Sequence, residues 1–455
     1  MRMVAGMCSR PPTSSTGSGF HPACCEIRLE NVSGEQFLGR AVTMKQIGVW
    51  VLQPECLMLP SGELVSQHDL LVEGDQIAAI VPRGRVPEGA VVHEATGMTL
   101  LPGLIDSHVH LTFSADGDMV RHLVEEGPAA QTERALDNAR RTIVGGVTTV
   151  FDCGGRTDVM LAVREALSGE GAQGPTTLVS GAPITTSEGH CHWLGGGADS
   201  EDEVLAMARA LAAAGVDMVK IMLTGGNVTH GSNPRMLQYP LDLLKALSGV
   251  CRELGLPLVV HAHTEAAVLM AASAGAQVVV HATCQNGDGE ISLAEPTVAA
   301  LLDSGIVVDA TVTVGALTDF PGATPRAAYR HEQRRAMLPV FARLAVAGVP
   351  LLAGTDAGVP GVQPGRVGDA VIALHREVGI DLSAALLAAT RTPAEVLGRG
   401  GQVGSLAVGM QADLLLVNGD VRTDVEAMRR VHSVWRGGRM VVSAGALLPV
   451  PEARM

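Results

Sequence analysis

Short apolar runs alternate with helix-like segments over residues 102–402. The intervening segments show apolar residues at helical spacing, most clearly in Glu201–Ala214, Leu241–Leu254, Glu265–Ala274 and Gln333–Ala347. Near-continuous apolar strands that alternate with helices are typical of a parallel sheet buried on both faces. There are eight runs: TLLPGLIDSHVH, GVTTVFDCGG, TTLVSGAPITT, DMVKIMLTGG, PLVVHAHT, VVVHATC, VVDATVTVG and VPLLAGTDAGV. Eight such units predict an α/β fold, a (β/α)8 TIM barrel.

Strand-like patterns of another kind flank this region. From Met44 to Leu101, alternating apolar runs are separated by turn signals, as in β-hairpins. A second strand-rich stretch follows near the C-terminus, in GMQADLLLV and VHSVWRGGRMVV. We therefore expect residues 44–101 plus 403–455 to form a small composite β-sandwich, with the barrel at 102–402. Residues 1–43 show no clear period and are expected to be an irregular N-terminal extension.

Groups that bind metals stand where several of the predicted strands end. His108 and His110 are two residues apart, so on an extended strand they point the same way and could chelate one ion. In a (β/α)8 barrel, active-site groups project from the carboxyl ends of the strands. The other strand-end candidates are His261, His263, His281 and Asp356. Each histidine alone is more often an ordinary buried residue, whereas their convergence on one barrel mouth indicates a metal centre.

Lys220 is an unusual residue for its surroundings. It lies in the apolar run VDMVKIML, where a charged amine is unfavourable unless it is paired or chemically changed. One interpretation is a lysine that reaches solvent or an ion pair. The other is a lysine that has reacted with carbon dioxide, because burial favours the neutral, reactive amine. The resulting carbamate is an anion that could bridge two metal ions.

Together these residues resemble the amidohydrolase superfamily of metal-dependent hydrolases. The resemblance rests on PGLIDSHVH at the first run, the lysine of the fourth, the histidines of the fifth and sixth, and GTDAG at the eighth. Within that superfamily the sequence is similar to the imidazolonepropionase-like and Xaa-Pro dipeptidase-like branch. The motifs of that branch appear here as EGH, VKIMLTGG, VHAH and VH, and the resemblance spans about residues 44–450.

The resemblance implies a role for each matched residue. His108, His110 and Asp356 match the ligands of a first metal, His261 and His281 those of a second, and Lys220 the carbamylated bridge. Zinc suits these ligands, with iron, cobalt or manganese as alternatives. Asp356 would also move the proton, and His190 would hydrogen-bond the substrate oxygen. Weaker candidates for substrate binding are His192, Trp193, His230, His263 and Val314.

The expected reaction is hydrolysis of a C–N bond in an amide, carbamate, urea or cyclic amide by a hydroxide that bridges two metals. Dipeptidase-like relatives usually carry a tyrosine where this chain has Val314, so we expect a small uncharged or hydrophobic substrate. The alternatives are an Xaa-Pro dipeptidase or N-acyl amino acid hydrolase, and a non-catalytic scaffold of the same fold. Relatives that deaminate generally lack the bridging lysine, which argues against that chemistry here.

Composition limits the function further. The chain has 455 residues, a formal net charge of -14 and 47% hydrophobic residues, so it can bury a large core and is not expected to bind nucleic acid or an anionic membrane. Its eight cysteines include no C-x-x-C pair and there is no signal-like apolar segment, which favours a cytoplasmic enzyme. Relatives are often homo-oligomers. Only three cations are lysines, and Lys220 is the one in an apolar strand.

Overall fold

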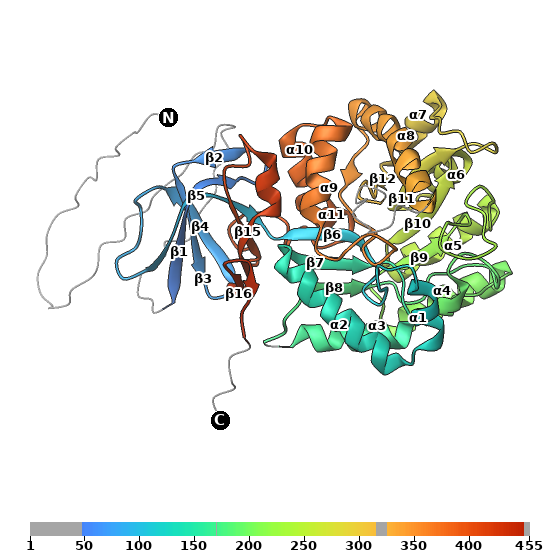
Figure 1. Ribbon diagram of the computed structural model, residues 1–455, viewed down its shortest axis with the longest axis horizontal. Helices are drawn as coiled ribbons and strands as arrows, with labels where there is room; N and C mark the ends of the chain where they lie inside the picture. The colour runs from blue at the N-terminus through green and yellow to red at the C-terminus, as the bar shows by residue number, and fades with distance from the viewer. Residues whose placement is uncertain (1–47, 170, 315–324, 450–455) are drawn as a thin grey trace, which may run out of the picture. The chain divides into compact units, whose positions relative to one another are not determined.

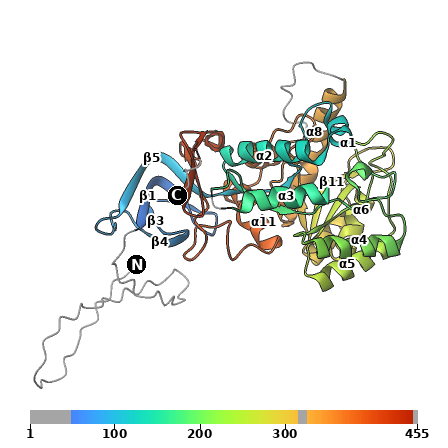
Figure 2. The same ribbon diagram turned by 90° about the horizontal axis from the view of Figure 1, so that it is seen from below.

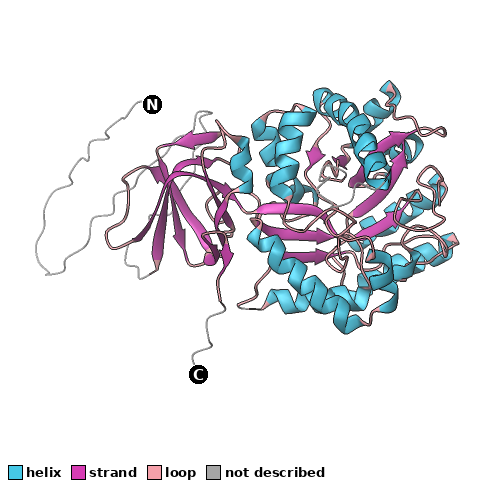
Figure 3. Ribbon diagram, in the orientation of Figure 1, coloured by secondary structure: helices cyan, strands magenta, loops and turns pink. Residues whose placement is uncertain are grey.

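The computed structural model describes residues 48–169, 171–314 and 325–449, and the predicted extension at 1–43 lies outside them. Eight parallel strands follow one another in the order of the eight predicted runs (Figures 1 and 3). They are β6 (Leu104–Val109), β7 (Val147–Asp152), β8 (Thr176–Val179), β9 (Val219–Met222), β10 (Leu258–Thr264), β11 (Val278–Gln285), β12 (Val307–Asp309) and β13 (Leu351–Leu352). Nearly every residue in them is buried, as expected for parallel strands covered on both faces.

Hydrogen bonds arrange these strands in two parallel sheets, β6-β7-β8 and β9-β10-β11-β12-β13. Isolated parallel bridges join the two sheets at both ends. Ile184, just after β8, pairs with Ile221 of β9, and Val109 of β6 pairs with Ala357, just after β13. The second bridge brings the carboxyl ends of the first and last strands together.

Helices follow most of these strands, and α4 and α5 lie side by side outside the strands (Figure 2). The α-helices are α1 (Met119–Glu125), α2 (Pro128–Val144), α3 (Thr157–Ser168), α4 (Glu201–Ala214), α5 (Leu241–Leu254), α6 (Glu265–Ala274), α7 (Glu295–Ser304), α8 (Pro325–Ala347), α9 (Val367–Ala373), α10 (Leu382–Leu387) and α11 (Arg391–Val396). There are also short 3-10 helices η1 (His192–Leu194) and η3 (Val425–Arg429), and a π-helix η2 (Leu374–Val378).

Local sequence signals explain where several helices begin and end. A capping box of Ser200 and Glu203 begins α4, and Gly215, at φ 88°, ends it. The predicted bounds of α4, α5 and α6 agree with the structure, whereas α8 begins at Pro325 rather than at the predicted Gln333. Proline is favoured at the first position of a helix, which agrees with this earlier start.

Both ends of the described chain contribute to a third sheet of nine strands. Its order is β17-β16-β15-β14-β5-β1-β3-β4, with β2 on β1, and β14 runs antiparallel to β5. The strands are β1 (Val49–Met58), β2 (Leu64–Ser66), β3 (His68–Glu73), β4 (Gln76–Pro82), β5 (Val91–Pro102), β14 (Leu414–Asn418), β15 (Val431–Arg436), β16 (Arg439–Ser443) and β17 (Ala446–Leu447). The arrangement of this sheet as a two-layer sandwich, and the predicted domain boundaries, stay predictions.

This sheet connects directly to the strand that carries the first histidines. Gly103, between β5 and β6, donates its N–H to the carbonyl oxygen of Asp413 at 2.8 Å, beside β14. A Cβ at Gly103 would lie 2.2 Å from Thr148 Oγ1, so only glycine fits there. Among the described residues, no helix is both long enough and apolar enough to cross a membrane.

Candidate metal centre

Three predicted ligands of the first metal meet where β6 ends beside the segment after β13. The side chains of His108, His110 and Asp356 are buried, and their ligand atoms lie within 4.8 Å of one another. Asp356 Oδ1 is 3.3 Å from His110 Nε2 and 3.6 Å from His108 Nε2. The Asp356 N–H donates to the carbonyl oxygen of His108 at 2.7 Å, so the two segments are joined at the site itself.

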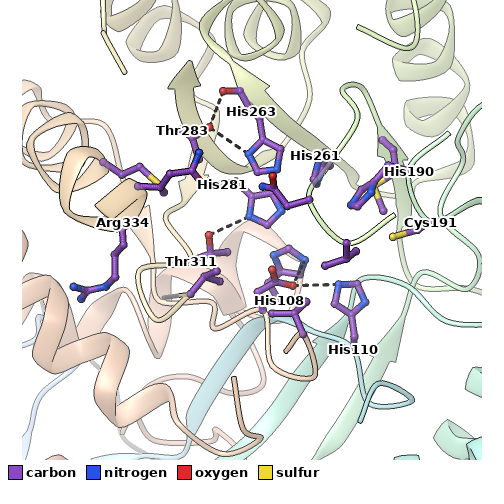
Figure 4. Close-up of a pocket in the computed structure, with 18 of the residues that line it drawn as sticks. His108, His110, His190, Cys191, His261, His263, His281, Thr283, Thr311 and Arg334 are labelled. Carbon is purple, nitrogen blue, oxygen red and sulfur yellow. Dashed lines mark hydrogen bonds and ion pairs between the residues drawn. The ribbon is translucent and has the colours of Figure 1, made fainter. Parts of the chain in front are cut away.

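A second group of ligands lies across the pocket on β10 and β11. His261, His263 and His281 are buried, and their ligand atoms again lie within 4.8 Å of one another. His261 and His263 share one face of β10 because they are two residues apart. The ring of His281 lies 4.7 Å from that of His261 and 5.2 Å from that of His108 (Figure 4). His281 is therefore a member of the second group whose ring also lies near the first group.

Lys220 of β9 is only 1% exposed. Its Nζ is 3.4 Å from His108 Nε2, and no ion pair of its amine is found within the described segments. The interpretation of Lys220 as a solvent-reaching or salt-bridged lysine therefore finds no support in the described part of the chain.

Each of three histidines has one ring nitrogen occupied by an oxygen acceptor. His110 Nδ1–H donates to the Gly154 carbonyl at 2.9 Å, and His261 Nε2–H donates to the Gly225 carbonyl at 3.1 Å. Thr283 Oγ1 donates to the carbonyl oxygen of His263 at 2.7 Å, so it can accept from His263 Nδ1–H at 3.2 Å. The other nitrogen of each ring keeps its lone pair, as in metal-bound histidines.

Burial keeps four imidazoles of the site neutral. Desolvation is the first cause that lowers the pKa of His108, His261 and His281 well below 6.5, and it lowers the pKa of His263 to about 4. Repulsion from neighbouring basic side chains, Lys220 among them, lowers these pKa values further. Neutral imidazole is the form that binds a metal ion.

The spacing of the ligand atoms fits a divalent ion. Ligand nitrogens lie about 2.1 Å from a tetrahedral zinc ion, which puts neighbouring ligand atoms about 3.4 Å apart. Asp356 Oδ1 lies 3.3 Å from His110 Nε2 and 3.6 Å from His108 Nε2, which agrees with this spacing. The backbone at two of the predicted ligands is also held in a left-handed conformation, with φ 59° at Asp356 and 67° at His281. Non-glycine residues adopt it at a cost of about 1–3 kcal/mol, and such strain is frequent at active sites.

Comparison with known proteins identifies the family. Residues 99–441 match the amidohydrolase family. The chain belongs to this family. It is therefore a hydrolase that acts on C–N bonds. The matched residues run from within β5 to within β16, so they include every predicted metal ligand.

Several relatives of this amidohydrolase have established names. Ochratoxinase from Aspergillus niger is 23% identical over 433 residues, which cover 86% of each chain. Imidazolonepropionase from Micrococcus luteus is 25% identical over 409 residues, covering 84% of this chain and 96% of the relative. A solved Xaa-Pro dipeptidase with bound methionine is 22% identical, with a TM-score of 0.77, over 86% of this chain and 99% of the other. The predicted branch of the superfamily is confirmed.

The amidohydrolase site opens into a pocket with a volume of about 860 Å³ including its mouth. Of the predicted substrate residues, His263 and Val314 line it, and so does His190. Trp193 is not among the lining residues but packs on Phe113, which is one of them, with ring centroids 5.9 Å apart. His192 and His230 are also absent from the described lining, and His230 is exposed. The structure thus brings the predicted metal ligands together, whereas His192, Trp193 and His230 stand outside the described pocket lining.

Sequence reasoning missed several site residues in this amidohydrolase, and two classes of them bear most on its chemistry. One consists of buried aspartates beneath the ligands: burial raises the pKa of Asp106 to about 7 and that of Asp309 to about 6. Each stands in or at the end of a predicted strand, which was an available signal. The other class is pocket-lining residues on helix α8, namely Gln333, Arg334 and Met337. The sequence holds no signal for them, because helical spacing alone does not show which face of a helix meets a pocket.

Proposed function

We propose that this amidohydrolase is a binuclear metal-dependent enzyme that cleaves a C–N bond in a small, uncharged or hydrophobic amide, carbamate, urea or cyclic amide. The observation that carries the proposal is the pair of ligand groups, one on β6 and after β13, the other on β10 and β11, with Lys220 beside His108. We also propose that the two parallel sheets close as one eight-stranded barrel, on the basis of the bridges at both seams.

The residues would hold two divalent ions, with zinc favoured and iron, cobalt or manganese as alternatives. His108, His110 and Asp356 are proposed for one ion, and His261 and His281 for the other, with His263 close enough to be an additional ligand. When bound, the metals would activate water and polarise the scissile carbonyl group. Lys220, once its amine has lost a proton, would attack carbon dioxide, form an N–C bond and release a second proton. The product would be an anionic carbamate that could supply oxygen ligands to the ions.

Two further groups are proposed to act on the substrate. The Asp356 carboxylate, which lines the pocket, would accept a proton from the attacking water and pass it to the leaving nitrogen. His190 is buried, and its Nδ1 has no hydrogen-bond partner among the described residues. Because burial lowers its pKa to about 3, the ring stays neutral and can donate its N–H to the oxygen that gains negative charge.

The pocket lining supports an uncharged substrate. Among its described residues, the apolar side chains are Phe113, Met222, Val228, Val314, Met337 and Val359. The relative solved as an Xaa-Pro dipeptidase keeps a dipeptidase or N-acyl amino acid hydrolase as the alternative. The second alternative, a non-catalytic scaffold, is disfavoured by the complete ligand set. A homo-oligomeric state and a cytoplasmic location stay predictions.

A substrate panel tests the proposal. The enzyme purified with bicarbonate and zinc would be assayed with matched anilides, carbamates, phenylureas, Xaa-Pro dipeptides and N-acyl amino acids. We expect kcat/KM to be highest for a neutral substrate, and Asp356→Asn to abolish turnover. Faster turnover of the dipeptides and N-acyl amino acids than of every neutral substrate would contradict the substrate class.

A further inference from the structure

An ion pair stands at the wall of the pocket, away from the metal ligands. Arg334 of α8 lines the pocket, and its side chain is only 5% exposed. Its guanidinium donates to both carboxylate oxygens of Glu377, at 2.7 and 2.6 Å, and its Nε–H donates to the Val312 carbonyl at 2.6 Å. In Figure 4 the guanidinium of Arg334 points away from the histidines.

Glu377 neutralises this arginine. Among the described lining residues, Arg334 is the one arginine and Lys220 the one lysine. The bidentate pairing occupies the groups with which arginine recognises a carboxylate, so a substrate anion finds no free fork. On the side where Arg334 lies, the pocket therefore offers no unpaired basic group to an anionic substrate.

The two partners differ in how much they depend on the pair. The Glu377 side chain is 44% exposed and can be hydrated without Arg334, whereas the buried guanidinium requires an anion. Glu377 also lies on the π-helix η2, a rare element that occurs frequently at functional sites. These observations distinguish the pair from an ordinary surface salt bridge.

We propose that Glu377 is a specificity-determining residue: by holding Arg334, it excludes carboxylate-bearing substrates from the pocket and selects neutral ones. This inference rests on the proposed function, because it concerns the same pocket. It predicts that removal of the Glu377 charge converts the buried Arg334 into a carboxylate-binding group.

The test compares Glu377→Gln with the wild-type enzyme on a matched pair of substrates, an N-acyl amino acid and its primary amide. The released guanidinium should raise kcat/KM for the acid by about 10- to 100-fold, the value of one hydrogen bond to a charged group. The kcat/KM for the amide should change by less than about threefold, because Glu377 is not among the described lining residues and the amide carries no charge that Arg334 could pair. Adding Arg334→Met to the variant should remove the gain.

A control variant and a binding measurement separate this effect from a general loss of charge. Glu295→Gln breaks an ion pair with Arg343, which is also on α8 but outside the described pocket lining, and should leave the selectivity unchanged. As a binding measurement, N-acetyl amino acids should raise the Tm of Glu377→Gln more than that of the wild type. Should Glu377→Gln be too unstable to assay, Glu377→Asp should give a smaller gain of the same sign, because the shorter side chain weakens the pairing.

Unchanged selectivity in both Glu377 variants, with no added stabilisation by N-acetyl amino acids, would overturn the inference. That result differs from the failure of the proposed function, in which the wild-type enzyme would hydrolyse no neutral substrate. A wild-type enzyme that already prefers the acid would also overturn the inference, since the paired arginine would then not exclude carboxylates.

Discussion

At the scale of single residues, neutrality of the imidazoles and space around them decide what the site can do. Gly226 shows the second requirement. A Cβ at this position would lie 2.3 Å from His190 Nε2, and the ring that it would meet is buried. The glycine of the VKIMLTGG motif therefore has a physical role that the motif alone did not reveal: it leaves room for His190.

Gly226→Ala tests this role. The added methyl group should displace His190 and lower kcat by about 10²- to 10³-fold, as for the loss of one oxyanion donor, while the metal content stays unchanged. Gly249→Ala is the matched control, because a Cβ there meets nothing within 4 Å in the middle of α5. It should leave kcat unchanged and stabilise the fold by about 0.5–1 kcal/mol. A Gly226→Ala enzyme with wild-type kcat would contradict this role of the glycine.

The buried His190 also predicts a pH dependence of stability. Its pKa is lowered from 6.5 to about 3 by burial first and then by repulsion from neighbouring basic side chains. The unfolded chain therefore binds a proton at a higher pH than the folded one. The stability due to neutral His190 is complete above pH 6.5 and falls as the pH decreases toward 3. Both the wild type and His190→Gln would be treated with a chelator. When the pH is lowered from 6.5 to 5, the free energy of unfolding of His190→Gln should fall by about 1–2 kcal/mol less than that of the wild type. Urea unfolding at both pH values measures this difference, and equal losses would refute the prediction.

At the scale of elements, strand ends explain why so much of the site was predictable. All eight predicted runs contain a strand, because a parallel strand buried on both faces needs a continuous apolar run, and the ligands follow where those runs end. His192 lies in the short 3-10 helix η1 and His230 in a loop. The paths of such segments depend on long-range contacts and leave no period in the sequence. Arg334 was missed for a similar reason, since its pairing with Glu377 joins residues 43 positions apart.

Asp106 shows how two elements are joined beneath the ligands. Its Oδ1 accepts the N–H of Thr355 at 2.9 Å and that of His108 at 3.3 Å, and its Oδ2 accepts the Thr355 hydroxyl at 2.6 Å. One carboxyl group in β6 thus holds the backbone beside Asp356 as well as that of His108. We regard Asp106 as a positioning residue.

Asp106→Ala should therefore weaken metal binding by about 10- to 100-fold, as other losses of hydrogen bonds behind ligands do. Competition with a chelator measures the metal affinity apart from catalysis. Asp106→Asn keeps one oxygen acceptor and should fall between the alanine variant and the wild type. Unchanged affinity in a folded Asp106→Ala protein would show that the ligands are positioned without it.

At the scale of the whole molecule, the chain returns from its C-terminal region to support the strand with which the site begins. β14 pairs with β5, and the Asp413 carbonyl holds Gly103 just before β6. The pairing of the N-terminal and C-terminal segments was expected, because both are rich in strand signals and lie outside the barrel pattern. The single sheet of nine strands was not expected, because it depends on hydrogen bonding that sequence patterns do not specify. The family match across residues 99–441 spans both parts.

The metal content of the purified protein tests the central claim most directly. The wild type, Lys220→Ala and Lys245→Ala would be prepared with zinc and bicarbonate, and bound metal would be counted per chain by mass spectrometry. Lys245 is exposed on α5 and provides a matched lysine control. We predict two metal ions per chain in the wild type and in Lys245→Ala, with loss of at least one ion and of hydrolysis in Lys220→Ala. Less than one ion per chain in the wild type, together with a fully active Lys220→Ala enzyme, would contradict the binuclear centre.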